Sequence, residues 1–123
     1  MTVEVVRPAA VSADESTRGV ARRTIFEGEE AVVVESSIAG GTTTGWHHHG
    51  DRHAYGYVLE GAGVVEFGPG GDRSRESAAG EYFHVPPGTV HRDRTRRGED
   101  TRVLVCFVGS GPVVVNVEGP AEG

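Results

Sequence analysis

The chain has 123 residues, of which 37% are hydrophobic and 24% charged, which fits one globular domain with a single core rather than a disordered chain. Its net charge of -6 disfavours nucleic acid or an anionic membrane surface as a partner. All twelve basic residues are arginine, and the lack of lysine excludes Schiff-base and pyridoxal-phosphate chemistry on this chain.

The N-terminal region lacks the basic start and continuous apolar stretch of a signal peptide. No apolar run reaches the roughly 18 residues that a membrane-spanning helix needs, so we expect a cytoplasmic protein. A weak helical signal covers residues 8–18, where Ser12 could cap a turn of helix.

The rest of the chain consists of short runs rich in β-branched residues, separated by glycine, proline and aspartate turn signals. These runs predict strands at residues 24–26, 31–35, 55–59, 64–67, 82–85, 103–108 and 113–117. Regularly spaced short strands favour an all-β sandwich or barrel. We expect one domain over residues 1–123, with frayed ends at 1–2 and 119–123. The single cysteine, Cys106, lies in an apolar run and is interpreted as a small buried hydrophobe.

Four of the six histidines lie within residues 46–53. In an extended strand His47 and His49 share one face and His48 points to the other, because side chains alternate with period two. Imidazole is the commonest protein ligand for divalent transition metals. His91, from a distant segment, is the candidate third ligand.

The spacing of two segments resembles the signature motifs of the cupin superfamily. The first segment has Gly41, His47, His49 and Gly61 at the positions of the pattern G-x5-H-x-H-x3-4-E-x6-G. The second has, in the order of the pattern G-x5-P-x-G-x2-H-x3-N, Gly80, Pro86, Gly88, His91 and, in place of the asparagine, Thr95. The resemblance covers residues 41–95 and implies a double-stranded β-helix, the small jelly-roll barrel of the cupins.

By this resemblance His47, His49 and His91 hold a divalent transition metal: Fe²⁺ is favoured, and Mn²⁺, Ni²⁺, Zn²⁺, Co²⁺ or Cu²⁺ remain open. Ala54 stands where the family usually has its glutamate ligand. Under the shorter-gap alignment His53 takes that place instead, provided that a bulge turns it inward.

A site of three neutral histidines resembles the Fe(II) sites of cupin thiol dioxygenases and diketone-cleaving dioxygenases, so a dioxygenase acting on a small molecule is the favoured function. Two alternatives remain open. One is a metal-dependent isomerase or lyase, in which the metal polarises a carbonyl group. The other is a non-catalytic domain that binds or senses a small ligand.

The candidate substrate-pocket residues are Trp46, Tyr55, His84 and Asp93. Trp46 fits a core or dimer-interface position equally well, whereas Asp93 shares the face of His91 by alternation. We also expect a homodimer, because small jelly rolls leave sheet edges unpaired and many cupins dimerise. Residues 3–6 are a candidate strand to cover such an edge.

Overall fold

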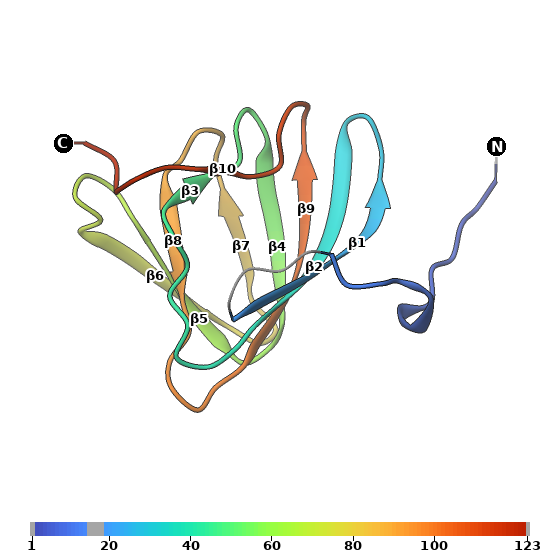
Figure 1. Ribbon diagram of the computed structural model, residues 1–123, viewed down its shortest axis with the longest axis horizontal. Helices are drawn as coiled ribbons and strands as arrows, with labels where there is room; N and C mark the ends of the chain where they lie inside the picture. The colour runs from blue at the N-terminus through green and yellow to red at the C-terminus, as the bar shows by residue number, and fades with distance from the viewer. Residues whose placement is uncertain (1, 15–18, 123) are drawn as a thin grey trace.

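A computed structural model describes residues 2–14 and 19–122, which form two antiparallel five-stranded sheets facing each other (Figure 1). The first sheet has the order β1 (Val20–Glu27), β2 (Ala31–Ile38), β9 (Thr101–Val108), β4 (His53–Glu60) and β7 (Tyr82–Val85). The second has the order β10 (Val115–Asn116), β3 (His47–His48), β8 (His91–Arg94), β5 (Ala62–Phe67) and β6 (Arg73–Ala78). The predicted all-β jelly roll is thereby confirmed.

Six of the seven predicted strand runs lie within strands of the sheets, although most of these strands are longer than the apolar run that predicts them. The run at 113–117 contains only the short strand β10, whereas 82–85 matches β7. The strands β3, β6 and β8 lie outside the predicted runs. Strand β6 was missed because its sequence RSRESA is almost entirely polar and its position at the sheet edge leaves it exposed. Hydrophobic alternation cannot reveal a strand that buries neither face.

The structure differs from the predictions for the N-terminal region. Of the helix expected at residues 8–18, the described part contains a single 3₁₀ turn, η1 (Pro8–Ala10), and residues 15–18 lie outside the described chain. Residues 3–6 form no strand: Val3 is 91% exposed, and the segment extends away from the barrel (Figure 1). Within the described residues, no helix is long and apolar enough to cross a membrane.

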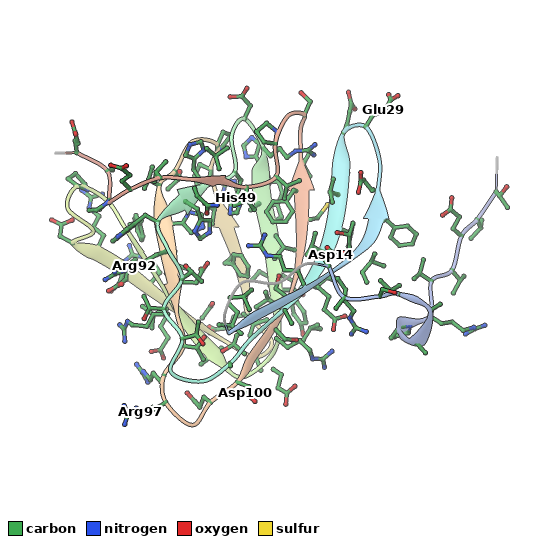
Figure 2. The ribbon with its side chains drawn as sticks, viewed as in Figure 1. Asp14, Glu29, His49, Arg92, Arg97 and Asp100 are labelled. Carbon is green, nitrogen blue, oxygen red and sulfur yellow. The ribbon has the colours of Figure 1, made fainter. Side chains whose placement is uncertain are left out.

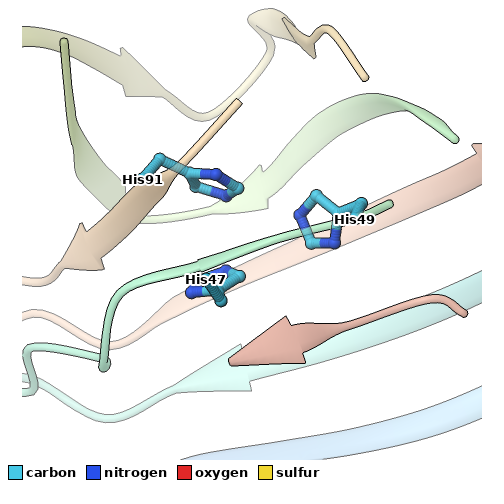
Figure 3. Close-up of side chains that lie close together, drawn as sticks. All are labelled: His47, His49 and His91. Carbon is cyan, nitrogen blue, oxygen red and sulfur yellow. The ribbon is translucent and has the colours of Figure 1, made fainter. Parts of the chain in front are cut away.

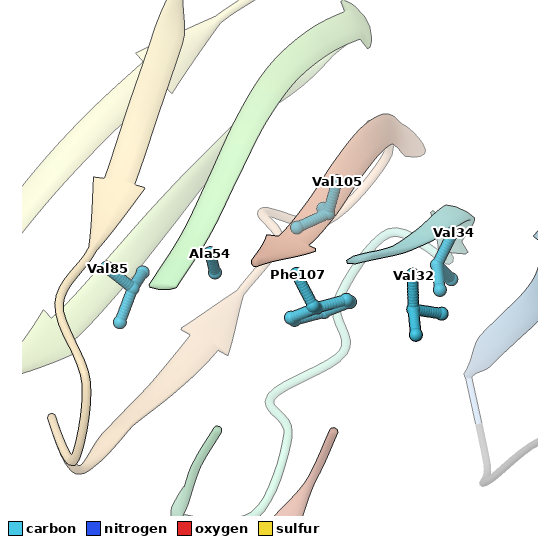
Figure 4. Close-up of a cluster of buried hydrophobic side chains, with 6 residues drawn as sticks. All are labelled: Val32, Val34, Ala54, Val85, Val105 and Phe107. Carbon is cyan, nitrogen blue, oxygen red and sulfur yellow. The ribbon is translucent and has the colours of Figure 1, made fainter. Parts of the chain in front are cut away.

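The core lies on the inner face of the first sheet (Figure 4). Its buried members are Val32, Val34, Ala54, Val85, Val105 and Phe107. Exposed charged groups such as Glu29, Arg97 and Asp100 lie on loops at the ends of the barrel, whereas His49 lies between the sheets (Figure 2). Partly buried Phe83 packs against this core.

Two glycines of β4 and its following turn shape the barrel near the site. A Cβ atom at Gly56 would lie 2.0 Å from the Phe83 ring, so only glycine lets that ring cross the strand. Gly61, the last glycine of the first motif, has φ +77°, a conformation that other residues rarely adopt. It ends β4 and lets the chain turn into β5.

Candidate metal centre

Three buried histidines meet between the two sheets, and their ligand atoms lie within 4.8 Å of one another (Figure 3). His47 and His49 come from β3 and the residue following it, and both are buried, at 5% and 6% exposure. His91 begins β8 and is paired directly with His47 across the antiparallel ladder. The expected alternation holds, since His48 is less buried than its two neighbours.

Backbone carbonyls hold each of the three rings. The Nδ1 atoms of His47, His49 and His91 each lie 2.8 Å from a carbonyl oxygen, those of Gly45, Val113 and Thr89. A carbonyl can only accept a hydrogen bond, so each Nδ1 must carry the proton. In a neutral imidazole the lone pair then resides on Nε2, which is the atom left for a metal.

Burial keeps two of these rings neutral. Burial is the main cause that lowers the pKa of His49 from its ordinary value of 6.5 to about 3; the nearby His91, His47 and Arg22 contribute to this shift, and the Val113 hydrogen bond opposes it. Burial also lowers the pKa of His47, assisted by His91 and Arg22 and opposed by the Gly45 carbonyl and Asp93. Three buried, carbonyl-oriented imidazoles therefore fit a divalent transition metal, which requires unprotonated nitrogen donors.

Asp93 lies beside this cluster, as the alternation along β8 predicts. Its Oδ2 is 3.6 Å from Nε2 of His47, and the side chain is about one-third exposed. Two contacts fix its backbone: the Asp93 N–H donates to Thr44 Oγ1 at 2.9 Å, and the Thr44 N–H donates to the Asp93 carbonyl at 2.8 Å. The carboxylate is thus held at the edge of the histidine cluster.

The cavity at the histidines has a volume of about 90 Å³. Ala54 lines it and is 1% exposed, so the position usually occupied by glutamate in cupins faces inward here with no donor atom. His53, the alternative fourth ligand, lies on the opposite face of β4 and is outside the histidine cluster. Its Nδ1 lies 3.0 Å from Nε2 of His84 on the outer surface. The reason is regular alternation through residues 53–58, without the bulge that His53 would need.

Three of the four candidate pocket residues lie away from the cavity. Tyr55 and His84 stack on each other on the outside of the first sheet, with ring centroids 4.6 Å apart. Trp46 lies under the guanidinium of Arg92, 4.6 Å from the ring centroid, and is not among the residues that line the cavity. Adjacency in sequence misleads here, because neighbouring strand residues point to opposite faces.

The sequence reasoning missed Arg22, which lines the cavity together with the histidines and Asp93. The sequence contains a weak indication that Arg22 faces inward. Arg22 has the same strand phase as Val20, which is buried, whereas the adjacent Arg23 points outward and pairs with Glu35 at 3.1 Å. Only a fixed strand register shows that an arginine in this run faces the interior.

Comparison with known proteins identifies a matching family and several structures with a similar fold. A sequence model of the cupin domain matches residues 34–108. The polyketide cyclase RemF from Streptomyces resistomycificus is 25% identical, with a TM-score of 0.79 over 94% of this chain and 86% of that one. An uncharacterized protein with a double-stranded β-helix domain from Klebsiella pneumoniae is 19% identical, with a TM-score of 0.71 over 85% and 90% of the two chains.

A third similar structure is that of Bacillus subtilis oxalate decarboxylase, which has Mn(II) centres. It is 17% identical, with a TM-score of 0.69 over 83% of this chain and 29% of that one. A search of curated protein sequences found no significant match. At such identities the manganese enzyme and the Klebsiella protein show a shared fold, whereas RemF shares 25% of its residues over nearly the whole chain.

Proposed function

The chain belongs to the cupin domain family, and on that premise we propose that it is a metal-dependent enzyme that moves a proton next to a carbonyl group of a small molecule. This is the chemistry of isomerases, lyases and cyclases. The observation that carries the proposal is the Asp93 carboxylate, 3.6 Å from Nε2 of His47 at the edge of the three-histidine cluster. The similarity of this chain to a polyketide cyclase supports the same class of reaction.

In this proposal the three histidines bind the metal. The Nε2 atoms of His47, His49 and His91 would hold the metal, and their carbonyl partners fix the ring orientations. A divalent metal bound there supplies Lewis acidity that polarises a carbonyl oxygen and acidifies the neighbouring C–H bond.

Asp93 then accepts the proton. Its carboxylate forms an O–H bond while the C–H bond breaks, and the electron pair of that bond moves into the carbon framework as an enolate. Returning the proton from Asp93 to another carbon gives isomerisation. In a dehydration the leaving hydroxide takes that proton and departs as water. In a ring closure the enolate carbon attacks a second carbonyl, and the alkoxide that forms takes the proton from Asp93. The valine and phenylalanine lining of the cavity limits the access of water to these steps.

A dioxygenase is the second candidate, and the donor set favours it. Three neutral histidines without a carboxylate leave the charge of a bound metal uncompensated by its protein ligands. This is the kind of site that the resemblance to three-histidine dioxygenases predicts. Such a reaction needs iron and consumes oxygen, and it does not need Asp93 as a base.

One set of measurements separates these candidates. Elemental analysis of untagged protein identifies the metal. NMR follows deuterium uptake in D₂O at the methyl group of methyl pyruvate that is bonded to the ketone carbon. An oxygen electrode follows oxygen consumption. Metal-dependent deuterium uptake that Asp93→Asn abolishes supports the proposal. Iron together with substrate-dependent oxygen uptake that survives in Asp93→Asn would replace it with the dioxygenase. Protein that binds no divalent metal would make the chain a binding domain.

A further inference from the structure

Arg22 is a half-buried cation inside the barrel. It lies on β1 in phase with the buried Val20, and it borders both the histidine cavity and a second cleft of about 400 Å³. That cleft lies between the first two strands and residues 111–114. Arg22 is thus a cation that lines both the histidine cavity and the cleft.

No carboxylate pairs with Arg22 among residues 2–14 and 19–122. Other arginines of the barrel do have such partners: Arg23 and Arg102 bind Glu35, and Arg92 binds Glu66 at 2.7 Å. Arg52, which lines the same cleft, has no carboxylate partner in the described chain but donates to the carbonyl oxygens of Gly111 and Phe107. Withdrawing a cation from water without an anionic partner is unfavourable. Arg22 is partly buried and has no carboxylate partner in the described chain, so an anion in the cavity would supply the missing opposite charge.

The charges around the cavity also favour the binding of an anion. The three histidines are neutral donors, so a divalent metal would bring two positive charges that its ligands do not offset. Arg22 adds a third, and Asp93 removes one. Arg94 also borders the cavity, but its Nε lies 3.9 Å from Glu66, which offsets it. The occupied site would therefore carry a net positive charge.

Asp14 is one acidic residue that could pair with the guanidinium, because it borders the same cleft. Its Oδ2 instead accepts a hydrogen bond from Thr24 Oγ1 at 2.6 Å. Glu27 lies at the rim of the cleft and is exposed. Neither forms an ion pair with Arg22 in the described chain.

We propose that Arg22 binds the carboxylate of the substrate, and that the substrate class is small oxygenated carboxylic acids such as 2-oxo acids. The proposal rests on the function proposed above, since it places a second oxygen of the same molecule at the histidine cluster. Arginine suits this task because its planar fork matches the two oxygens of a carboxylate. The inner cavity of about 90 Å³ admits only a small group, so any longer part of the acid lies in the outer cleft.

The test uses pyruvate as the anionic probe and methyl pyruvate as its neutral counterpart. Binding of each is measured by calorimetry on Zn²⁺-loaded and metal-free protein, and metal content is determined on the same samples. The variants are Arg22→Gln and Arg22→Lys, with Arg23→Gln as the matched control, because that neighbour points outward and pairs with Glu35. Circular dichroism verifies that each variant keeps the barrel.

We expect Arg22→Gln to weaken pyruvate binding by about tenfold to hundredfold, the range for loss of a charge-assisted contact. Binding of methyl pyruvate and Zn²⁺ content should not change, Arg22→Lys should recover part of the affinity, and Arg23→Gln should match the parent protein. The parent protein should also prefer pyruvate to its ester, and high salt should reduce that preference.

Two results overturn the inference: a parent protein without preference for the anion, or an Arg22→Gln variant that binds pyruvate within about twofold of the parent, well short of the expected loss. Failure of the proposed function is a separate result. Protein that holds no metal and exchanges no protons, yet binds pyruvate through Arg22, refutes the enzyme and keeps the anion site. Protein that catalyses the exchange but binds pyruvate equally well without Arg22 keeps the enzyme and refutes the anion site.

Discussion

Asp93 and His47 face each other from adjacent strands of the second sheet, with Oδ2 of the carboxylate 3.6 Å from Nε2 of the imidazole. The contact joins Asp93, which lines the cavity, to the nitrogen of His47 that its hydrogen bond with Gly45 leaves free for a metal. A base placed beside a metal ligand can reach a substrate that the same metal polarises. This contact is the basis of the proton transfer that we propose.

Replacing Asp93 by Asn should abolish proton exchange without removing the metal. The amide keeps the size of the side chain but cannot accept a proton, so we expect a loss of at least about a hundredfold in the exchange rate. Metal content should stay near that of the parent protein, because the three nitrogens are unchanged. Asp72→Asn, at an exposed turn position, is the control. Equal exchange rates in the Asp93 variant and the parent would remove this carboxylate from the mechanism.

Removing any one of His47, His49 and His91 should strip the metal and leave the barrel folded. Each His→Ala change deletes one of three convergent nitrogens, and two histidines on their own bind divalent ions far more weakly. His53→Ala is the matched control, because that ring bonds His84 on the outer face. Metal content by mass spectrometry and circular dichroism give the two readouts. Retention of full metal content by one of the three variants would exclude that residue as a ligand.

Ala54→Glu should restore a carboxylate to the position that cupins usually give to a metal ligand. Ala54 is 1% exposed and lines the cavity, so the new side chain points at the histidines. Without metal, a buried carboxylate should destabilise the fold, and the melting temperature of metal-free protein should fall. Added metal should recover the loss and bind at least as tightly as in the parent. The added negative charge should also raise the pKa of metal-bound water and lower the native activity.

A melting temperature of metal-free Ala54→Glu equal to that of the parent, with no change in metal affinity, would mean that position 54 does not reach the site. Ala54→Gln serves as the control here, because it adds similar bulk without the charge. The comparison of the two variants isolates the electrostatic part of the effect.

The metal-free protein should lose stability as the pH falls below about 6.5. The pKa of His49 is about 3 in the folded state against 6.5 for the ordinary side chain, and that of His47 is also lowered. Between these values the unfolded chain binds more protons than the folded one, so protonation favours unfolding. Above about pH 6.5 both states are neutral at these rings and the effect disappears.

Each such group contributes at most about 1.4 kcal/mol per pH unit within that window. Urea unfolding between about pH 7 and pH 4.5 measures the slope. The His49→Gln variant, which lacks the titrating ring, should show a shallower dependence. A parent protein whose stability stays flat over this range would contradict the lowered pKa values.

We propose that the chain forms a homodimer through the outer face of the first sheet. Tyr55, Tyr82, Leu104 and Val108 are 47%, 79%, 37% and 39% exposed on strands of that sheet. Apolar groups gathered on one sheet face favour a protein partner. Light scattering at tens of micromolar should give twice the mass of 13.0 kDa, and Leu104→Glu should shift it toward the monomer. A monomeric mass for the parent protein would end this proposal.

The amino-acid sequence was enough to predict the fold class and the three central histidines. Short β-branched runs predicted most of the strands, and alternation placed His47 and His49 on one face, because both signals depend only on neighbours along the chain. The spacing of the two motifs added His91 to this pair. The polar edge strand β6 escaped, since it carries no hydrophobic pattern.

Which residues share the cavity depends on the tertiary structure. Pairing of His47 with His91 comes from two segments more than forty residues apart in sequence, and it depends on a register that no local pattern sets. The strand registers of the first sheet turn Ala54 inward and His53 outward, place Arg22 in the cavity, and leave Tyr55 and His84 on the outer surface. A shift of one residue in strand pairing reverses every side chain, so only the assembled sheets fix these positions.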